Sequence, residues 1–224
     1  DSWLETVDDD IAERHFIFDY QQLFEGEENN IEEIRRFTPV VPRVDISIVQ
    51  SICCMLSSLM KSKEFLEVAK NLKEEDKKTI FEAYFMYAGV WAIGGAIADE
   101  TVAKQFNTWW RSKFKKFPEA GTVYDYYFDP KKLNWEPWAD LVTEYVPIAE
   151  QTVSSIIVPT VDIIRIKAVI ELHVQGRRGT MFVGGSGTGK TTIAKDYLSC
   201  LNSEEVQNSA INFNNYTDSM ALQR

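Results

Sequence analysis

GGSGTGKT, the sequence from Gly184 to Thr191, fits the phosphate-binding pattern G-x-x-x-x-G-K-[ST] at every fixed position. Its glycines allow the backbone to curl with the N–H groups directed inward, so the loop can surround the β-phosphate of a nucleotide. Lys190 can reach the β- and γ-phosphates, and the Thr191 hydroxyl can bind Mg²⁺. The positive end of the following helix would lie on the same phosphates. These residues predict a nucleoside triphosphate site.

The sequence on both sides of this loop has the order that such a site requires. Residues 180–183 (TMFV) are predicted to form a short buried strand before the loop. A flexible Gly/Ser linker is seldom flanked in this way. A dinucleotide-binding G-x-G-x-x-G is excluded because Lys190 stands where its third glycine should follow. After the loop, apolar residues recur at helical spacing: Ile193, Ala194, Tyr197, Leu198 and Leu201.

The composition narrows the classes of partner. The chain has 224 residues and a formal net charge of -10, which argues against a nucleic-acid-binding or acidic-membrane-binding surface. We therefore expect no nucleic acid and no membrane among the partners. The apolar run over residues 83–98 is shorter than the roughly 20 residues of a membrane-spanning helix, so a helix buried in protein is the better interpretation. Three cysteines form no disulfide framework, and a reducing, cytosolic setting fits best.

The character of the chain changes at Pro118. Residues before it have helical periodicity, whereas β-prone stretches follow at 123–128 and 153–158, with a compact aromatic turn at 135–138. After the loop helix, one more strand is predicted at 209–213, and a P-loop sheet of about five strands needs more chain than this. Because the start is also acidic and lacks an initiator Met, we expect an incomplete nucleotide domain from a longer chain.

In this order, the segments resemble a dynein heavy chain. The part that they resemble runs from the lid of the second AAA+ module into the start of the third. Residues 157–162 (IVPTVD), with Arg165, resemble the entry to the family's third module. Residues 211–213 (Ile211-Asn212-Phe213) are similar to the next strand of that module. One departure is Arg43, where Thr is common, and the particular heavy chain stays undecided. The helical lid resembles Val41-Pro42, Val44-Asp45, Val90-Trp91 and Gly94-Gly95, and the connecting segment resembles VYDYY at 123–127 and WEPW at 135–138, the latter in its axonemal form.

The resemblance implies an α/β fold with a helical domain. An all-α AAA+ lid would cover residues 1–117, a connecting segment 118–157, and the N-terminal part of a P-loop AAA+ α/β domain 158–224. The intact protein would be an ATP-driven microtubule motor for ciliary or flagellar movement, in the cytoplasm, cytoskeleton and axoneme. Its third module would bind ATP or ADP with Mg²⁺ and regulate the main ATPase in the first. Expected partners are the neighbouring AAA+ modules of the same heavy chain, microtubules through other parts of the protein, and dynein intermediate and light chains.

The resemblance also implies the residues of the site. No catalytic residue is assigned, since the only acidic pair after the loop, Glu204-Glu205, is predicted to lie in a polar loop. Hydrolysis would need residues beyond Arg224 and an arginine from the neighbouring module, so whether this module is an ATPase stays open. Thr191 is the expected Mg²⁺ ligand. The expected nucleotide-binding residues are Val158, Pro159 and Thr160 against adenine, and Gly184, Gly185, Ser186, Gly187, Thr188, Gly189, Lys190, Thr191 and Thr192 around the phosphates and Mg²⁺.

Two other functions remain open at this point. One is a stand-alone P-loop NTPase or a kinase for nucleotides or metabolites, although such enzymes usually carry the loop near the start of the chain. The other is a structural AAA+ brace without turnover. An intact Lys190 and Thr191 disfavour a vestigial loop, yet binding can persist where hydrolysis does not.

Overall fold

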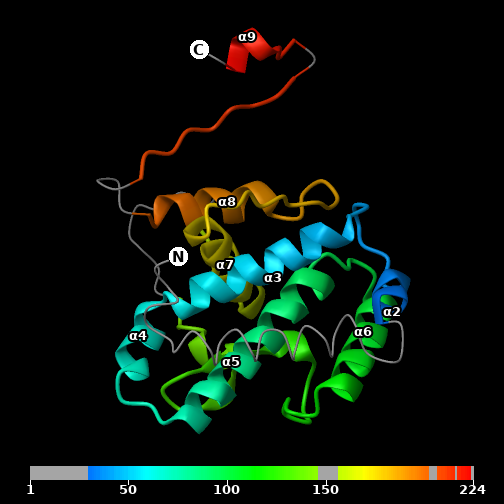
Figure 1. Cartoon of the computed structure of the whole chain (residues 1–224). Coiled ribbons are helices and arrows are strands. Elements are labelled where there is room, and N and C mark those ends of the chain that lie inside the picture. Colours follow the sequence, from blue (N-terminus) through cyan, green and yellow to red (C-terminus); the bar gives the residue numbers. More distant parts are fainter. Residues whose placement is uncertain (1–29, 146–155, 202–205, 215, 223–224) are drawn as a thin grey trace. The chain divides into compact units, whose positions relative to one another are not determined.

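The computed structural model describes residues 30–145, 156–201, 206–214 and 216–222 (Figure 1). The chain divides into two compact units, Asp1–Val183 (unit 1) and Gly184–Arg224 (unit 2). Unit 2 contains α8 (Lys190–Ser199) and α9 (Ser219–Leu222). The described elements of unit 1 are α2 (Asn30–Arg36), α3 (Asp45–Met60), α4 (Lys63–Ala69), α5 (Glu74–Gly89), the π-helix η2 (Val90–Gly94), α6 (Glu100–Lys113), the 3-10 helix η3 (Val123–Asp125), β1 (Tyr126–Asp129), β2 (Asn134–Pro137), the 3-10 helix η4 (Trp138–Leu141) and α7 (Val161–Gln175).

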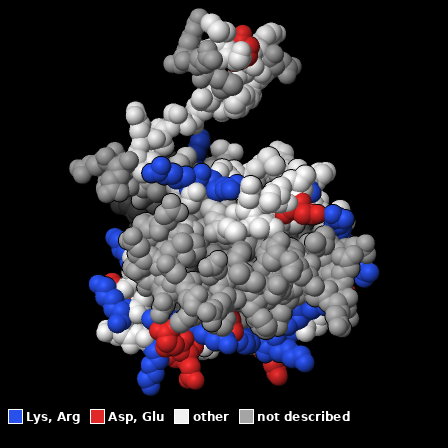
Figure 2. Space-filling view, viewed as in Figure 1, with Lys and Arg blue, Asp and Glu red and all other residues white. Residues whose placement is uncertain are grey.

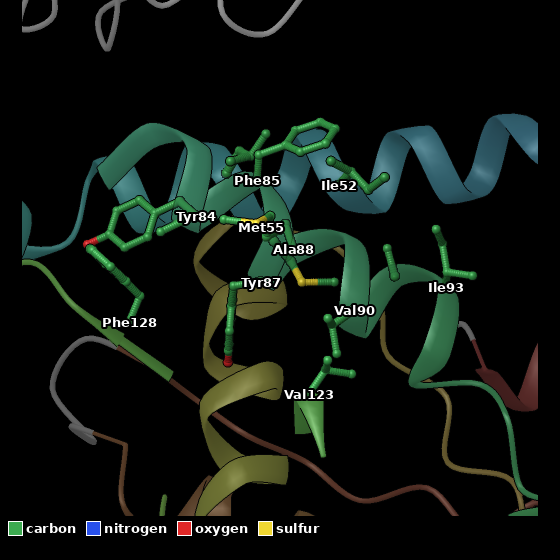
Figure 3. Packing of buried hydrophobic residues seen from close by; sticks show 14 of the residues in the cluster. Ile52, Met55, Tyr84, Phe85, Tyr87, Ala88, Val90, Ile93, Val123 and Phe128 are labelled. Atoms are coloured by element: carbon green, nitrogen blue, oxygen red, sulfur yellow. The ribbon is translucent and has the colours of Figure 1, made fainter. Parts of the chain in front are cut away.

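Unit 1 has its core around α5. Nearly every residue from Ile80 to Ile93 is buried, so α5 and η2 form a central rod that other helices cover. Ile52 and Met55 of α3 are buried in the same cluster. Figure 3 shows Phe85 on the side of α5 that faces Ile52, whereas Tyr87 points away from it. The predicted buried apolar helix is therefore confirmed in its location.

The end of this rod differs from the prediction of one helix over residues 83–98. The α-helix ends at Gly89, the wider π-helix η2 continues it, and residues 95–98 are not helical. The guanidinium of Arg43 donates hydrogen bonds to the carbonyl oxygens of Ala92 and Ile93, the second at 3.0 Å. The last carbonyls of a helix have no partner within it, so Arg43 satisfies two of them. This gives a structural role to the residue that departs from the family pattern.

Aromatic residues join α6 and the connecting segment to the rod. Phe106 and Trp110 of α6 are completely buried, and their rings stack with centroids 5.6 Å apart. The α6 helix ends at Lys113, so helical structure stops before the predicted position at 117. Asn107 accepts a hydrogen bond from the backbone N–H of Val123 at 2.8 Å, which holds η3 against α6.

The β-structure of unit 1 is a small antiparallel hairpin. Strands β1 and β2 pair in the register Tyr126↔Pro137 to Asp129↔Asn134. The predicted strand at 123–128 is therefore correct only from Tyr126, because residues 123–125 form η3. The predicted aromatic turn at 135–138 is the end of β2 and the start of η4, and Trp135 packs on Phe128 with ring centroids 5.4 Å apart.

Helix α7 packs on α3 and η4. Thr160 caps its start, since the Thr160 hydroxyl accepts a hydrogen bond from the Ile163 N–H at 3.4 Å. Leu172 is buried in the core of unit 1, and Val161, Ile164 and Ala168 are packed against that core.

Three predicted strands are absent from the described structure. Residues 180–183 and 209–213 have no regular structure, and Met181 and Phe213 are 72% and 71% exposed. Of the predicted strand at 153–158, residues 156–158 are irregular, and 153–155 lie outside the described residues. A strand is stable only when its backbone groups pair with a neighbour. In the described part of the chain, the one sheet is the β1–β2 hairpin, which does not include these segments.

Charged side chains of both signs are mixed on the surface. Along the lower edge of Figure 2, lysines and arginines alternate with aspartates and glutamates. Ion pairs in unit 1 include Lys77–Glu74 at 2.8 Å and Lys131–Glu67 at 3.0 Å. None of the helices in the described ranges combines the length and the apolar character needed to cross a bilayer.

Candidate nucleotide-binding site

The phosphate-binding loop of unit 2 has the backbone conformation that its glycines permit. Gly187 has φ = 76° and Gly189 has φ = 80°, both in the left-handed region that favours glycine. Gly189 is also the residue before α8, which begins at Lys190. The N–H groups of the first helical turn have no acceptor within a helix. Those of Lys190, Thr191 and Thr192 are therefore available for an anion.

The Lys190 side chain turns back over the loop. Its ammonium donates hydrogen bonds to the Gly184 carbonyl at 3.0 Å, to the Thr188 hydroxyl at 3.1 Å and to the Gly185 carbonyl. The Thr188 hydroxyl itself donates to the Gly185 carbonyl at 3.0 Å. A lysine ammonium has three donors and no acceptor, so the loop oxygens use its full capacity.

The loop has room for the phosphates of a bound nucleotide. A Cβ atom at Gly187 or Gly189 would meet no atom within 4 Å, so the loop has open space beside its backbone. Thr191 lies in the first turn of α8 and is exposed. Among the residues whose placement is described, no group of three or more His, Cys, Asp or Glu could hold a metal ion. Mg²⁺ in nucleotide sites usually keeps phosphate oxygens and water as ligands, and Thr191 as a further ligand stays a prediction.

The predicted adenine-binding residues belong to unit 1. Val158 is 49% exposed, Pro159 is half-buried and Thr160 is exposed. Together they form the segment that leads into α7. The structure thus places these three residues in unit 1 and Gly184–Thr192 in unit 2.

The contacts that anchor residues 158–160 and α7 were not predicted from the sequence. Arg165, one turn into α7, pairs with Asp162 at 2.6 Å and with Asp125 of η3 at 3.8 Å. At the other end of α7, polar contacts come from Gln50, Cys54 and Ser58 of α3. Their spacing of four residues places them on one side of α3. This four-residue spacing was the one sign of the contact in the sequence. The apolar residues of the same helix, such as Ile52 and Met55, form a stronger pattern.

Comparison with known proteins decides the family. The dynein heavy chain AAA lid domain matches residues 20–140, and the P-loop containing dynein motor region matches residues 145–224. This chain belongs to the dynein heavy chain family. It is 34% identical to dynein axonemal heavy chain 11 of Sus scrofa over 193 residues and 33% identical to dynein axonemal heavy chain 9 of Homo sapiens over 193 residues. It is 30% identical to the dynein alpha chain of the flagellar outer arm of Chlamydomonas reinhardtii over 199 residues.

These matches cover 84%, 84% and 87% of this chain but only 4% of each relative. The resemblance predicted from the sequence is confirmed, and so is the fold class: a helical AAA lid is followed by the start of a P-loop AAA domain. The chain is part of the motor region of a dynein heavy chain, with axonemal and flagellar relatives. A P-loop motor region implies nucleotide binding.

Proposed function

We propose that this dynein segment forms the start of a regulatory, nucleotide-binding AAA+ module, the third of the motor ring, preceded by the lid of the second. The observation that carries the proposal is the loop in unit 2. Two glycines in the left-handed region lead directly into α8, and the Lys190 ammonium is held above the loop oxygens. This arrangement suits binding of the phosphates of ATP or ADP.

Each expected residue has a physical task in this proposal. The backbone of Gly184–Gly189 surrounds the phosphates. The N–H groups in the first turn of α8, including the N–H of Thr192, point to the same phosphates. Lys190 exchanges its loop acceptors for phosphate oxygens, and the Thr191 hydroxyl binds Mg²⁺. Val158, Pro159 and Thr160 lie against adenine. Bound nucleotide supplies the negative charge that these groups neutralise.

The intact heavy chain would use this module to regulate the main ATPase in the first module. It would work as a microtubule motor in the cytoplasm and cytoskeleton and, given its axonemal and flagellar relatives, in the axoneme of a cilium or flagellum. Its partners would be the neighbouring AAA+ modules of the same chain, microtubules through other regions, and intermediate and light chains. Nucleic acid and membrane are not among them, in keeping with the net charge of -10.

Lys190→Ala in the full-length heavy chain tests the proposal. Removing a charged donor weakens an interaction of about 1.5–3 kcal/mol, so affinity for Mg-ADP at this site should fall about 10- to 150-fold. Microtubule gliding should slow while the first module still binds ATP. Lys195→Ala, an exposed lysine on the same helix, is the matched control and should change neither property.

Two outcomes would favour the competing functions. If Lys190→Ala empties this site and gliding velocity is unchanged, the module is a structural brace. If the 224-residue chain alone turns over nucleotide and Lys190→Ala abolishes that turnover, an independent NTPase or kinase activity is present. Membership of the dynein heavy chain family weighs against this second function.

A further inference from the structure

Helix α3 presents two different faces. Its apolar face, which includes Ile48, Ile52 and Met55, is buried in the core of unit 1. A second row, Gln50, Cys54 and Ser58, is spaced by four residues and contacts the C-terminal end of α7. These contacts join segments more than 100 residues apart in the sequence.

The contact at Ser58 is buried and specific. Ser58 is 3% exposed, and its hydroxyl donates to the Leu172 carbonyl at 2.6 Å. The N–H of Gly176 donates to the same carbonyl at 3.1 Å. The Leu172 carbonyl thus accepts one bond within its own helix and one from the Ser58 hydroxyl, and the Cys54 thiol of α3 is a third, weaker donor at 3.9 Å. The α7 end is therefore held in register with α3.

The next contact requires a glycine. A Cβ atom on Gly176 would overlap the Cys54 sulfur and would lie 3.3 Å from the Ser58 hydroxyl. The φ of Gly176 is -78°, an ordinary value, so its lack of a side chain serves the close approach of α7 to α3. Beyond it, the Arg178 guanidinium donates to the Gln50 side chain at 3.1 Å.

The contacts with α3 end at this point. A Cβ atom at Gly179 would meet nothing within 4 Å, and residues 179–183 are exposed. At its other end, α7 starts directly after Val158, Pro159 and Thr160. A helix of 15 residues is a rigid rod about 22 Å long. Fixing its last turn on α3 and its first turn through Arg165 and Asp125 fixes the residues that precede it.

We propose that the α3 row, acting through Ser58 and the Cys54–Gly176 contact, positions the adenine-binding segment 158–160. Ser58, Cys54 and Gly176 are then positioning residues for recognition of the base, although none of them touches nucleotide. The inference rests on the proposed nucleotide site. Adenine binding would then depend on the packing of α7 on α3 in unit 1. Phosphate binding would depend only on the residues of the phosphate-binding loop.

The experiment compares two probes in the full-length heavy chain. Mg-ADP carries adenine, whereas Mg-pyrophosphate carries only the phosphates. Hydrogen–deuterium exchange of peptides covering 156–165 and 184–192 reports binding at each segment during a titration. In Gly176→Ala, the added methyl pushes α7 off α3, and affinity for Mg-ADP should fall about tenfold. Affinity for Mg-pyrophosphate should be unchanged.

Three further variants separate positioning from a general loss of structure. Cys54→Ala combined with Gly176→Ala removes the overlapping sulfur and should restore Mg-ADP affinity. Ser58→Ala, which keeps the fold but loses one hydrogen bond, should lower that affinity about fivefold. Gly179→Ala is the matched control and should match the natural chain.

The inference is overturned if Gly176→Ala and Ser58→Ala leave Mg-ADP affinity unchanged, or if they lower the affinity for both probes equally. Failure of the double variant to recover would also contradict it. Failure of the proposed function has a different signature. In that case the natural chain shows no protection of 184–192 with either probe, or Lys190→Ala does not reduce it, whatever the α3 variants do.

Discussion

Arg177 occupies a backbone conformation that L-residues adopt at a cost. Its φ is 54°, and it follows the end of α7 at the position where helices commonly place glycine. The N–H of Arg177 bonds to the Val174 carbonyl and that of Arg178 to the His173 carbonyl, as a Schellman motif requires. The glycine stands one residue earlier, at 176, where the approach to Cys54 needs it. The chain thus accepts a strained backbone at Arg177, because its glycine stands at 176 and allows the close contact with Cys54.

Arg177→Gly should therefore stabilise unit 1. Relief of the left-handed conformation is worth about 1–2 kcal/mol, and the greater chain entropy of glycine offsets roughly half of this, which leaves a gain of about 0.5–1 kcal/mol. Urea unfolding followed by tryptophan fluorescence measures the difference. Arg177→Ala removes the same charge but keeps a Cβ atom, so it should give no gain. An equal gain from both variants would show that the side chain, and not the backbone, is responsible.

At the scale of elements, the contact between α5 and α6 depends on a missing side chain. A Cβ atom on Gly89 would overlap the ring of Trp110, which is completely buried. Trp110 also lies 4.7 Å from Phe114 and stacks with Phe106, measured between ring centroids. Its indole cannot move without displacing these rings. The α5–α6 spacing is thus set by glycine on one helix and tryptophan on the other.

Gly89→Ala should lower the free energy of unfolding by about 1–3 kcal/mol, because overpacking outweighs the better helix propensity of alanine. Thermal unfolding monitored by circular dichroism provides the measurement. Gly179→Ala adds the same methyl group where nothing lies within 4 Å and serves as the control. An unchanged or raised midpoint for Gly89→Ala would mean that Trp110 can shift aside.

At the scale of the whole molecule, unit 1 has a core rich in tyrosine as well as tryptophan. Burial raises the pKa of Tyr84, Tyr87 and Tyr124 well above the usual range of a phenol. An unfolded tyrosine ionises near pH 10. The folded state therefore keeps protons that the unfolded state releases above this pH. The stability that these groups contribute is complete below about pH 10 and is lost as the pH rises towards their folded pKa.

Unit 1 should accordingly unfold in alkali. Above about pH 10 each of these phenols should lower the free energy of unfolding by about 1.4 kcal/mol per pH unit. Urea unfolding at a series of pH values from 8 to 11 gives the slope. Tyr87→Phe keeps the ring and removes one titrating group, so its slope should be smaller by about 1.4 kcal/mol per pH unit. The same slope in both proteins would contradict the linkage.

Local sequence patterns located helices and the phosphate-binding loop, although they did not give the helix ends at Gly89 and Lys113. Helical periodicity and the G-x-x-x-x-G-K-[ST] spacing describe interactions between residues close in sequence, and the structure contains α8 directly after the loop, as predicted. Family membership also followed from short motifs taken in order, and the comparisons confirmed it.

Tertiary structure alone decided the remainder. β-Propensity at 180–183 and 209–213 did not produce strands, because pairing depends on a neighbouring strand and not on the segment itself. The end of α5 at Gly89 and the π-helix after it accompany the approach of Trp110, Tyr124 and the Arg43 guanidinium. The same holds for Ser58, whose partner lies 114 residues away. A hydroxyl on a helix carries no sign of which distant carbonyl it will meet, since that depends on how the two helices pack.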